Sequence, residues 1–436
     1  MSLNSDQEKA LKFIQSWWFS SHQEMILDGP AGVGKSYLIN EVLKTIPSMK
    51  PLIISPTHEA LKQLRDKVEG DYPFKTAHSA LGIAPIEDEK ELDFEHIAYP
   101  SIWDKVNICI ADEVSMFPLP IVKLLHGTKV KILWCGHAAQ LPPVNKHRRI
   151  FDKCVSPVFQ LDIPTITLTI PQRNTGKLWD FCNDLAEDVY NEKNMILPLD
   201  FDIKKTDLVN YVNSEGKEEI FQGKTKFILW TNNGVDKYNR RFRVNYFGEA
   251  AKEKPYLPGD KILLTKPVAC VDFLEKHTDK TLRKLTSNKE IPSLYSNSKG
   301  TVIHAEEKLV KLNQSLHIPV WKITCDIAGD IINLYEPVFR QDHERIAIFY
   351  EHEAWGFKDV TKKKKAYKER NFIRSCFADI KHSYAMSAHR SQGSSIENVI
   401  LIYNDIMKNP CSVERKKCLY VGASRAIKNL MVYRGL

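Results

Sequence analysis

The feature that most restricts the fold of this chain is the glycine-rich run GPAGVGKS at residues 29–36. It follows a short apolar segment, 25–27, and precedes a segment, 38–43, whose apolar residues recur at helical spacing. A glycine turn between a buried strand and a helix is typical of a parallel sheet with crossover helices. Further apolar strands are expected at 52–55, 106–111 and 130–135, so the first part of the chain is predicted to be an α/β domain.

The same run satisfies the pattern G-x-x-x-x-G-K-[ST], which predicts a nucleotide-binding loop. Gly29, Gly32 and Gly34 let the backbone curl so that its N–H groups face phosphate oxygens at a helix N-terminus. Lys35 is expected to contact the β- and γ-phosphates, and the Ser36 hydroxyl is expected to ligate Mg²⁺. The predicted cofactors are therefore ATP and Mg²⁺.

A pair of carboxylates follows the next strongly apolar strand. The segment VNICIADE, 106–113, ends in Asp112 and Glu113. A carboxylate at the tip of such a strand holds Mg²⁺ in P-loop NTPases, which suits Asp112, and Glu113 is the candidate to orient or deprotonate the attacking water. Together the two motifs predict NTP hydrolysis, but they do not say what the hydrolysis drives.

The remainder of the chain alternates between two patterns. Strand-then-helix segments return at 228–243 and from Ile373 to the end, whereas 246–371 reads as short strands separated by turn residues and ends in the charged run KKKKAYKER. The predicted fold class is α/β, with two parallel-sheet domains and a β-rich insertion in the second. The predicted boundaries are 1–165 for the first domain, 166–245 plus 372–436 for the second, and 246–371 for the insertion.

Length and composition indicate a folded, multidomain cytoplasmic protein. The 436 residues suggest roughly three domains, and 43% hydrophobic with 27% charged residues is the balance of a soluble protein. No apolar run approaches the ~20 residues of a membrane span, and the N-terminus carries no signal-peptide pattern. The nine cysteines have no spacing typical of zinc sites, which indicates reduced thiols. A net charge of +8 is compatible with a nucleic-acid partner without requiring one.

Several further segments occur in a fixed order along the chain. They are SPTHEAL (55–61), KTAHSALG (75–82), ADEVSM (111–116), GHAAQLPPV (136–144), LTIPQRN (168–174), LWTNNGVDKYN (229–239), MSAHRSQGSSIENV (386–399) and LYVGASRA (419–426). As an ordered set they resemble the motifs of superfamily 1B DNA helicases, the branch that contains RecD and the T-even phage helicase Dda. By this resemblance ADEVSM is motif II, GHAAQLPPV is motif III, MSAHRSQGSSIENV is motif V and LYVGASRA is motif VI. The match spans nearly the whole chain.

This resemblance implies an architecture and an activity. The architecture is two RecA-like domains, with a pin-like hairpin at about 84–104 in the first and an SH3-like insertion in the second. The activity is ATP-driven 5′-to-3′ movement on single-stranded DNA, with unwinding at duplex junctions by a monomer. The same resemblance implies a phage setting in DNA replication or recombination, with a single-strand-binding or replication protein as a partner.

The resemblance also assigns roles to single residues. Gln7 takes the position of the adenine-reading glutamine, and Gln140 takes that of the residue near the γ-phosphate. Arg173 and Arg425 take the positions of two arginine fingers, which stabilise transition-state charge. The implied contacts to the DNA are Thr57, His58, His78, His389, Arg390 and Ser394, together with Phe94 as the aromatic residue of the pin.

Motif III departs from the resemblance at His137, where relatives commonly carry an acidic residue. ATP hydrolysis is still expected because Gln140 is retained. The coupling through motif III stays open between three readings: a neutral histidine that hydrogen bonds in place of the acid, a tolerated loop substitution, and a weakened motor.

Two other functions compete with a helicase. The first is a single-stranded nucleic-acid-stimulated ATPase that displaces bound proteins without robust unwinding. The second is a P-loop kinase or a structural ATPase subunit, which would leave the arginine motifs and the SAHRSQG segment unexplained. Backbone contacts alone leave DNA and RNA both open, and the lysine run 362–365 is interpreted as a solvated charged surface.

Overall fold

The computed structural model describes residues 3–85, 94–96, 101–143, 155–172, 176–189, 199–269, 293–312, 316–355 and 359–435. For residues 84–85, 94–96, 350–355, 360 and 363–369 it describes the backbone alone. The chain forms two compact units. The larger unit contains residues 1–212, 224–235 and 386–436, and the smaller unit contains residues 213–223 and 236–385. Among the described residues, no helix is both long and apolar enough to cross a membrane.

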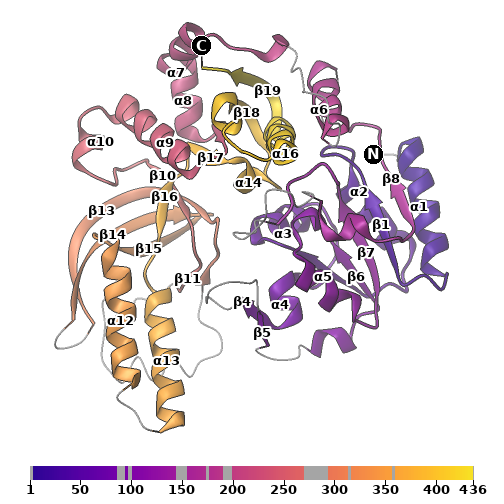
Figure 1. The fold of residues 1–436 in the computed structure, drawn as a ribbon, viewed down its shortest axis with the longest axis horizontal. Coiled ribbons are helices and arrows are strands. Elements are labelled where there is room, and N and C mark those ends of the chain that lie inside the picture. The colour runs from indigo at the N-terminus through magenta and orange to yellow at the C-terminus, as the bar shows by residue number, and fades with distance from the viewer. Residues whose placement is uncertain are drawn as a thin grey trace. The chain divides into compact units, whose positions relative to one another are not determined.

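The first part of the larger unit is a parallel sheet covered on both faces, here called the first lobe (Figure 1). Its strands lie in the order β3-β2-β6-β7-β1-β8. Their bounds are β1 Glu24–Asp28, β2 Pro51–Ser55, β3 Phe74–Thr76, β6 Ile108–Ala111, β7 Lys131–Gly136 and β8 Thr165–Thr167. The non-consecutive order requires crossover helices, which are α2 Lys35–Thr45, α3 His58–Arg65, α4 Ala77–Leu81 and α5 Leu119–His126. Helix α1, Ser5–Trp18, precedes the first strand.

Alternate residues of the buried strands face two separate cores. Ile108 and Ile110 of β6 pack with α1 and α2, while Cys109 and Ala111 pack with α4 and α5. This two-residue alternation explains why the sequence of a strand buried on both faces is continuously apolar. The short helices η1 Ser101–Asp104, η2 Val114–Met116 and η3 Pro157–Gln160 complete the lobe.

A backbone hairpin is inserted between α4 and η1. Strand β4, Ile83–Pro85, pairs antiparallel with β5, Phe94–His96, and Pro85 lies opposite Phe94. The hairpin lies within the segment predicted to carry a pin.

The second lobe, within the same unit, is a smaller sheet in the order β17-β9-β18-β19. The strands are β9 Thr225–Leu229, β17 Ala385–Ser387, β18 Ile396–Ile402 and β19 Ala426–Tyr433. Strand β18 is parallel to both β9 and β19, and its core includes residues of α6 and α16. The helices and turns of this part are α6 Lys177–Asp188, η4 Leu199–Phe201, α7 Lys205–Asn213, α14 Ala388–Ser391, α15 Tyr403–Ile406 and α16 Ser412–Ala423.

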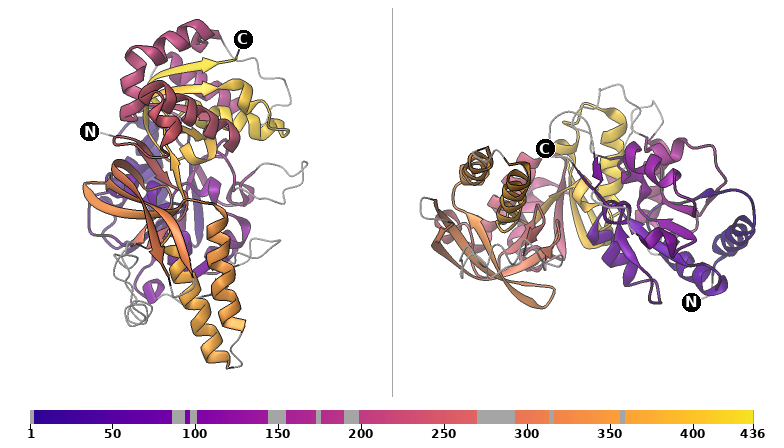
Figure 2. Two further views of the ribbon diagram at one scale, coloured as in Figure 1. Left: turned by 90° about the vertical axis from the view of Figure 1, so that its left-hand side faces the viewer. Right: turned by 90° about the horizontal axis from the view of Figure 1, so that it is seen from below.

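The smaller unit is built on an antiparallel sheet with the order β15-β14-β13-β10-β16. The strands of this sheet are β10 Lys261–Leu264, β13 Lys299–Lys311, β14 His317–Ile327, β15 Asp330–Pro337 and β16 Ile380–His382. Strands β11 Val268–Ala269 and β12 Ser293–Leu294 pair with each other in a separate two-stranded sheet. The helices of the smaller unit are α8 Glu215–Gln222, α10 Ala250–Glu253, α12 Gln341–Trp355 and α13 Val360–Ser375, and α9, Asn232–Phe247, runs into it from the larger unit. Figure 2 shows α12 and α13 as an adjacent pair.

The predicted fold class is confirmed: two parallel sheets flanked by helices, and a β-rich insertion in the second α/β domain. Two strands refine the predicted boundaries between the domains. Strand β8 continues the first sheet to Thr167, and β16, at 380–382, belongs to the antiparallel sheet because it pairs with β10. The inserted module also contains the long helices α12 and α13.

Candidate nucleotide and nucleic-acid site

Three predicted motifs lie together at the carboxyl edge of the first sheet. The glycine-rich loop follows β1, the carboxylate pair follows β6, and motif III follows β7. Strands β6, β7 and β1 are consecutive neighbours in the sheet. Because parallel strands end at one edge, the fold brings these loops together although up to 100 or so residues separate them.

The loop after β1 is shaped by glycine and supported by Gln7. Gly34 caps α2 with φ of 86°, and a Cβ placed there would lie 2.4 Å from Nε2 of Gln7, so the position favours glycine. The buried Gln7 amide donates to the Val33 carbonyl at 3.2 Å, and its Oε1 accepts the Asn4 N–H in a capping box. Gln7 therefore ties the first helix to the loop.

Lys35 lies folded over the same loop. Its ammonium donates to the carbonyls of Gly29 at 2.5 Å and Pro30 at 3.0 Å. The side chain lines a cavity of about 270 Å³, close to the lower limit of ordinary ligand pockets. The predicted residues that line the cavity are Gly32, Gly34, Lys35, Ser36, Asp112, Glu113, Gln140, Ser394 and Arg425. This set includes residues of both lobes.

The carboxylate pair at the end of β6 is electrostatically unusual. Burial, and then the neighbouring Glu113 carboxylate, raise the pKa of Asp112 to about 6, while Lys35 opposes this shift. Glu113 has a left-handed backbone, with φ of 52° and ψ of 41°. Such a conformation is uncommon for a residue with a side chain and is concentrated at functional sites.

A residue not predicted from the sequence, Gln392, links motifs II, III and V. Its amide nitrogen donates to Oγ of Ser115 at 2.8 Å and lies 3.4 Å from the carboxylate of Glu113. Ser115 in turn donates to Oε1 of Gln140 at 3.4 Å. Gln392 is buried, and its Oε1 accepts no hydrogen bond from the described residues. The only sign in the sequence that Gln392 has a functional role was its position in the SAHRSQG segment.

Of the two predicted arginine fingers, Arg425 lies within the described residues and Arg173 does not. Arg425 is buried and lines the cavity, where its guanidinium donates to the Val421 carbonyl at 3.0 Å and the Ser424 hydroxyl at 2.9 Å. Arg173 lies outside the described residues. Its neighbour Gln172 lines the same cavity and donates its backbone N–H to the Gly32 carbonyl at 2.8 Å.

Helix α16 contacts two loops of the first lobe, the glycine-rich loop and motif III. Lys417 is fully buried and donates to the carbonyls of Ala138 at 2.6 Å and Gln140 at 3.0 Å. The Tyr420 hydroxyl accepts the Ala31 N–H of the glycine-rich loop at 3.2 Å. Ala139 and Leu141 of motif III are part of the core of the second lobe. Motif III is thus held by the second lobe as well as by the strand that it follows.

His78 and His389, predicted DNA contacts, occupy equivalent local structures in the two lobes. Thr76 ends β3 and caps α4, and Ser387 ends β17 and caps α14, each at 3.3 Å. Each cap is followed by alanine and then histidine. The same strand–cap–helix turn therefore carries one histidine in each lobe.

The other predicted DNA contacts differ from one another in burial and in local structure. Thr57 caps α3 through its hydroxyl, and burial lowers the pKa of the adjacent His58 to about 4, so this ring is neutral at pH 7. Burial also lowers the pKa of His78. Arg390 is partly exposed on α14, whereas Ser394 is buried and lines the nucleotide cavity. The side chain of Phe94 lies outside the described part of the chain.

Models of two protein families match this chain. Residues 16–146 match an AAA domain, and residues 382–433 match a UvrD-like helicase C-terminal domain. The two matches cover the glycine-rich loop and motifs II and III in one lobe, and motifs V and VI in the other.

Relatives align along almost the entire chain. An uncharacterized protein, R530, of Acanthamoeba polyphaga mimivirus is 21% identical, and the alignment covers 97% of each protein. The ATP-dependent DNA helicase Pif1 of Campylobacter jejuni is 23% identical over 93% of this chain and 87% of its own length.

Solved structures share the fold at lower identity. A structure described as the basis for unwinding of forked dsDNA by two coordinating Pif1 helicases has a TM-score of 0.54 at 16% identity, covering 99% of this chain and 92% of that one. Bacteroides Pif1 bound to ssDNA has a TM-score of 0.50 at 17% identity, with the same coverage.

Proposed function

Because the chain belongs to the superfamily 1 helicases of the Pif1-like 1B branch, we propose that it hydrolyses ATP to move 5′ to 3′ along single-stranded DNA and to unwind duplexes. The observation that carries this proposal is the shared cavity. Lys35 and Glu113 of one lobe and Arg425 of the other line the same space. A nucleotide bound there would contact both lobes at once.

In this proposal the first lobe binds and activates the nucleotide. Lys35 would exchange its loop carbonyls for the β- and γ-phosphates, and Ser36 with Asp112 would hold Mg²⁺. Held there, the ion would supply positive charge against the charge that develops on the phosphate oxygens. Glu113 is proposed to orient the attacking water, and Gln392 to fix the position of that carboxylate. Gln140 is proposed to lie near the γ-phosphate.

The second lobe is proposed to complete the site and to respond to it. Arg425 supplies positive charge to the transition state without the possibility of deprotonation, and Arg173 is proposed as a second finger. Loss of the γ-phosphate removes the attraction that holds Arg425 to the first lobe, so hydrolysis favours opening. A monomer suffices for this cycle because both lobes belong to one chain.

Movement requires each lobe to grip the strand in turn. The matched turns that carry His78 and His389 support one grip in each lobe, and Thr57, His58 and Arg390 are proposed as further contacts to the strand. Imidazole and hydroxyl groups bond phosphates without reading sequence. Ser394 faces the nucleotide cavity, so we propose that it reports the nucleotide state to motif V.

The competing function is an ATPase that is stimulated by single strands and strips bound proteins without unwinding. One experiment separates the two: ATP hydrolysis with and without single-stranded DNA or RNA, followed by strand release from 5′-tailed and 3′-tailed duplexes. The helicase proposal expects DNA stimulation and release of the 5′-tailed duplex alone. Stimulation without release would favour the stripping function, and absence of stimulation would overturn both.

A matched pair of lysine variants ties the activity to the cavity. Lys35→Ala should lower kcat about 10²–10³-fold, the usual cost of removing one group that stabilises transition-state charge. Lys67→Ala, which changes another lysine lining the same cavity, should retain activity within about threefold, since no step is assigned to Lys67. Equal losses in both variants would argue against the assigned role of Lys35.

A further inference from the structure

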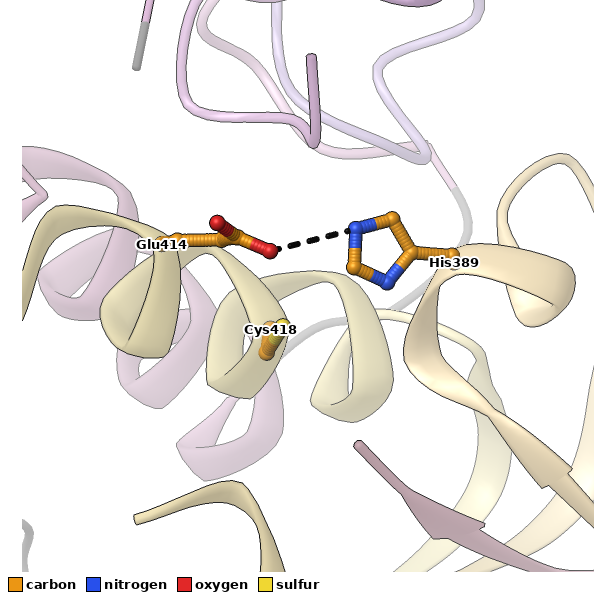
Figure 3. Close-up of side chains that lie close together, drawn as sticks. All are labelled: His389, Glu414 and Cys418. Carbon is orange, nitrogen blue, oxygen red and sulfur yellow. Dashed lines mark ion pairs between the residues drawn. The ribbon is translucent and has the colours of Figure 1, made fainter. Parts of the chain in front are cut away.

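Three side chains with metal-binding chemistry converge in the second lobe, and none of them lines the nucleotide cavity. They are His389 of α14 and Glu414 and Cys418 of α16, and their ligand atoms lie within 4.8 Å of one another. Figure 3 shows the Glu414 carboxylate directed at the imidazole of His389, with Cys418 on the next turn of α16. Nε2 of His389 lies 3.4 Å from Oε1 of Glu414.

The local fold explains why these groups meet. Glu414 and Cys418 are four residues apart on one helix, so their side chains lie on the same face one turn apart. His389 is supplied by α14, which packs against α16 within the same lobe. All three groups therefore keep their mutual positions whatever the two lobes do relative to each other. Sequence spacing gave no hint of this cluster because the histidine is distant from the other two residues.

We propose that His389, Glu414 and Cys418 form a binding site for Zn²⁺. An imidazole, a thiolate and a carboxylate are a donor set that zinc accepts, whereas Mg²⁺ and Ca²⁺ prefer oxygen ligands alone. Three protein ligands leave the fourth tetrahedral position for water. Binding deprotonates the thiol: Zn²⁺ and the Cys418 S–H give a zinc–sulfur bond and one proton, which passes to solvent.

The distances require only a small adjustment. Bond lengths of about 2.0–2.3 Å to nitrogen, oxygen and sulfur place the ligand atoms of a tetrahedral site roughly 3.5 Å apart. The separation between His389 and Glu414 is already close to this value, and the remaining ligand separations, which are at most 4.8 Å, need to close by no more than about 1.3 Å. Cys418 is fully buried, while the side chains of His389 and Glu414 are 21% and 19% exposed, so the metal enters from their side.

The occupied site has a consequence for motif V, and this consequence rests on the proposed function. With Nε2 of His389 bound to zinc, that atom is unable to bond a DNA phosphate. Zinc is therefore expected to weaken binding of single-stranded DNA. The metal site itself is tested without DNA or ATP. A failure of the zinc proposal is therefore distinguishable from a failure of the proposed helicase function.

The test uses the full chain and Co²⁺ as a spectroscopic substitute for Zn²⁺. Wild-type protein should bind about one Co²⁺ with thiolate-to-cobalt charge-transfer absorption in the near ultraviolet, and Zn²⁺ should displace it. Cys418→Ser should abolish this absorption, and Glu414→Gln should keep it while weakening Zn²⁺ affinity at least 10-fold. Cys411→Ser, which removes the thiol of the N-cap residue of α16, is the matched control and should behave as wild type.

Two results would overturn the proposal. One is a wild-type spectrum without thiolate charge transfer, which needs no variant and is unaffected by any misfolding of Cys418→Ser. The other is equal Zn²⁺ affinity in wild type and Glu414→Gln, which would mean that zinc binds elsewhere. In either case His389 and Glu414 form a simple ion pair. Fluorescence anisotropy of labelled single-stranded DNA with and without Zn²⁺ then reports the motif V consequence separately.

Discussion

Nδ1 of His137 lies 3.0 Å from Oδ1 of Asp28, and Asp28 is the last residue of β1 before the glycine-rich loop. The His137 ring also meets the Tyr420 ring edge-on, with centroids 5.8 Å apart. Motif III therefore joins the base of the nucleotide loop to α16 through a histidine. An acidic residue at position 137 would instead face the Asp28 carboxylate. The histidine that stands in place of the usual acidic residue of motif III is therefore matched by a carboxylate partner, Asp28, in this chain.

The contact between His137 and Asp28 predicts a rank order for the effects of substitutions at these two positions on ATPase activity and on the melting temperature. His137→Asp should lower ATPase activity and the melting temperature more than His137→Asn does, because two carboxylates would share one site. Adding Asp28→Asn to His137→Asp should recover most of the loss. The expected coupling free energy is about 0.5–3 kcal/mol, obtained from a double-mutant cycle of melting or denaturant unfolding. Additive effects would show that the two side chains act independently.

The contacts of α16 predict that Lys417, and not the adjacent Lys416, couples the two lobes. Lys417 donates to motif III carbonyls of the first lobe, whereas Lys416 donates to the Asp188 carbonyl within its own lobe, at 2.9 Å. Lys417→Met should reduce DNA-stimulated ATPase about 10-fold, since it leaves buried carbonyls without a donor at a cost of about 1–3 kcal/mol.

Lys416→Met is the matched control, because Lys416 is also buried and also binds a carbonyl. It should lower stability by a comparable amount while keeping DNA stimulation of the ATPase. The measurement is the ratio of kcat with and without single-stranded DNA for each variant. If the two variants lose the same share of stimulation, the contacts to motif III have no special part in coupling.

The network around Gln392 predicts an effect on kcat without an effect on nucleotide affinity. Gln392→Ala should lower kcat about 10-fold, equivalent to about 1.4 kcal/mol, because the Glu113 carboxylate loses a neighbouring donor. The KM for ATP should stay within about twofold, since Gln392 is assigned no contact with the nucleotide. Gln63→Ala, at another glutamine that lines the cavity, is the control. A rise in KM with unchanged kcat would contradict the positioning role.

The sequence predicted the nucleotide loop, the carboxylate pair and the parallel sheets because local patterns specify them. A glycine-rich turn between a strand and a helix needs few distant contacts to be recognised. Lys417 shows the opposite case. A lysine is expected at the surface, but here its partners are carbonyls some 280 residues earlier in the chain. Only the packing of α16 against motif III makes its burial possible.

The insertion shows a second limit of sequence reasoning. The segment 246–371 was predicted to be β-rich, and its strands are present, but its last part forms α12 and α13. Helix α13 starts at an N-cap, where Asp359 accepts the N–H groups of Thr361 and Lys362. The highly polar composition of the lysine run hides this helix, since it offers little amphipathic periodicity to detect.

A buried carboxyl in the smaller unit predicts a pH dependence of stability. Burial raises the pKa of Glu336 from 4.5 to about 7, against hydrogen bonds from the Tyr256 hydroxyl and the Ile380 N–H. The folded state thus holds a proton that the unfolded state releases at lower pH, so stability falls as pH rises from about 4.5 to 7. Glu336→Gln should flatten this slope and raise the melting temperature above pH 7, as measured by calorimetry from pH 5 to 8. An unchanged slope would mean that Glu336 titrates normally.

The backbone hairpin supports a last prediction, on strand separation. Phe94 begins β5 and pairs with Pro85 at the end of β4. Stacking of a base on an aromatic ring is worth roughly 1–3 kcal/mol, comparable with the ~1.4 kcal/mol of one duplex step. One ring at the fork is therefore enough to change the balance between open and closed base pairs.

Phe94→Ala should slow unwinding of a 5′-tailed duplex roughly 5-fold or more, while DNA-stimulated ATPase stays within about twofold. Phe94→Trp should retain unwinding because the aromatic face is kept. Phe19→Ala, which removes a ring that is 81% exposed after α1, controls for the loss of any exposed aromatic and should unwind normally. Because stacking acts on the duplex and not on the nucleotide, a parallel fall of ATPase and unwinding in Phe94→Ala would instead place this ring in the packing of the first lobe.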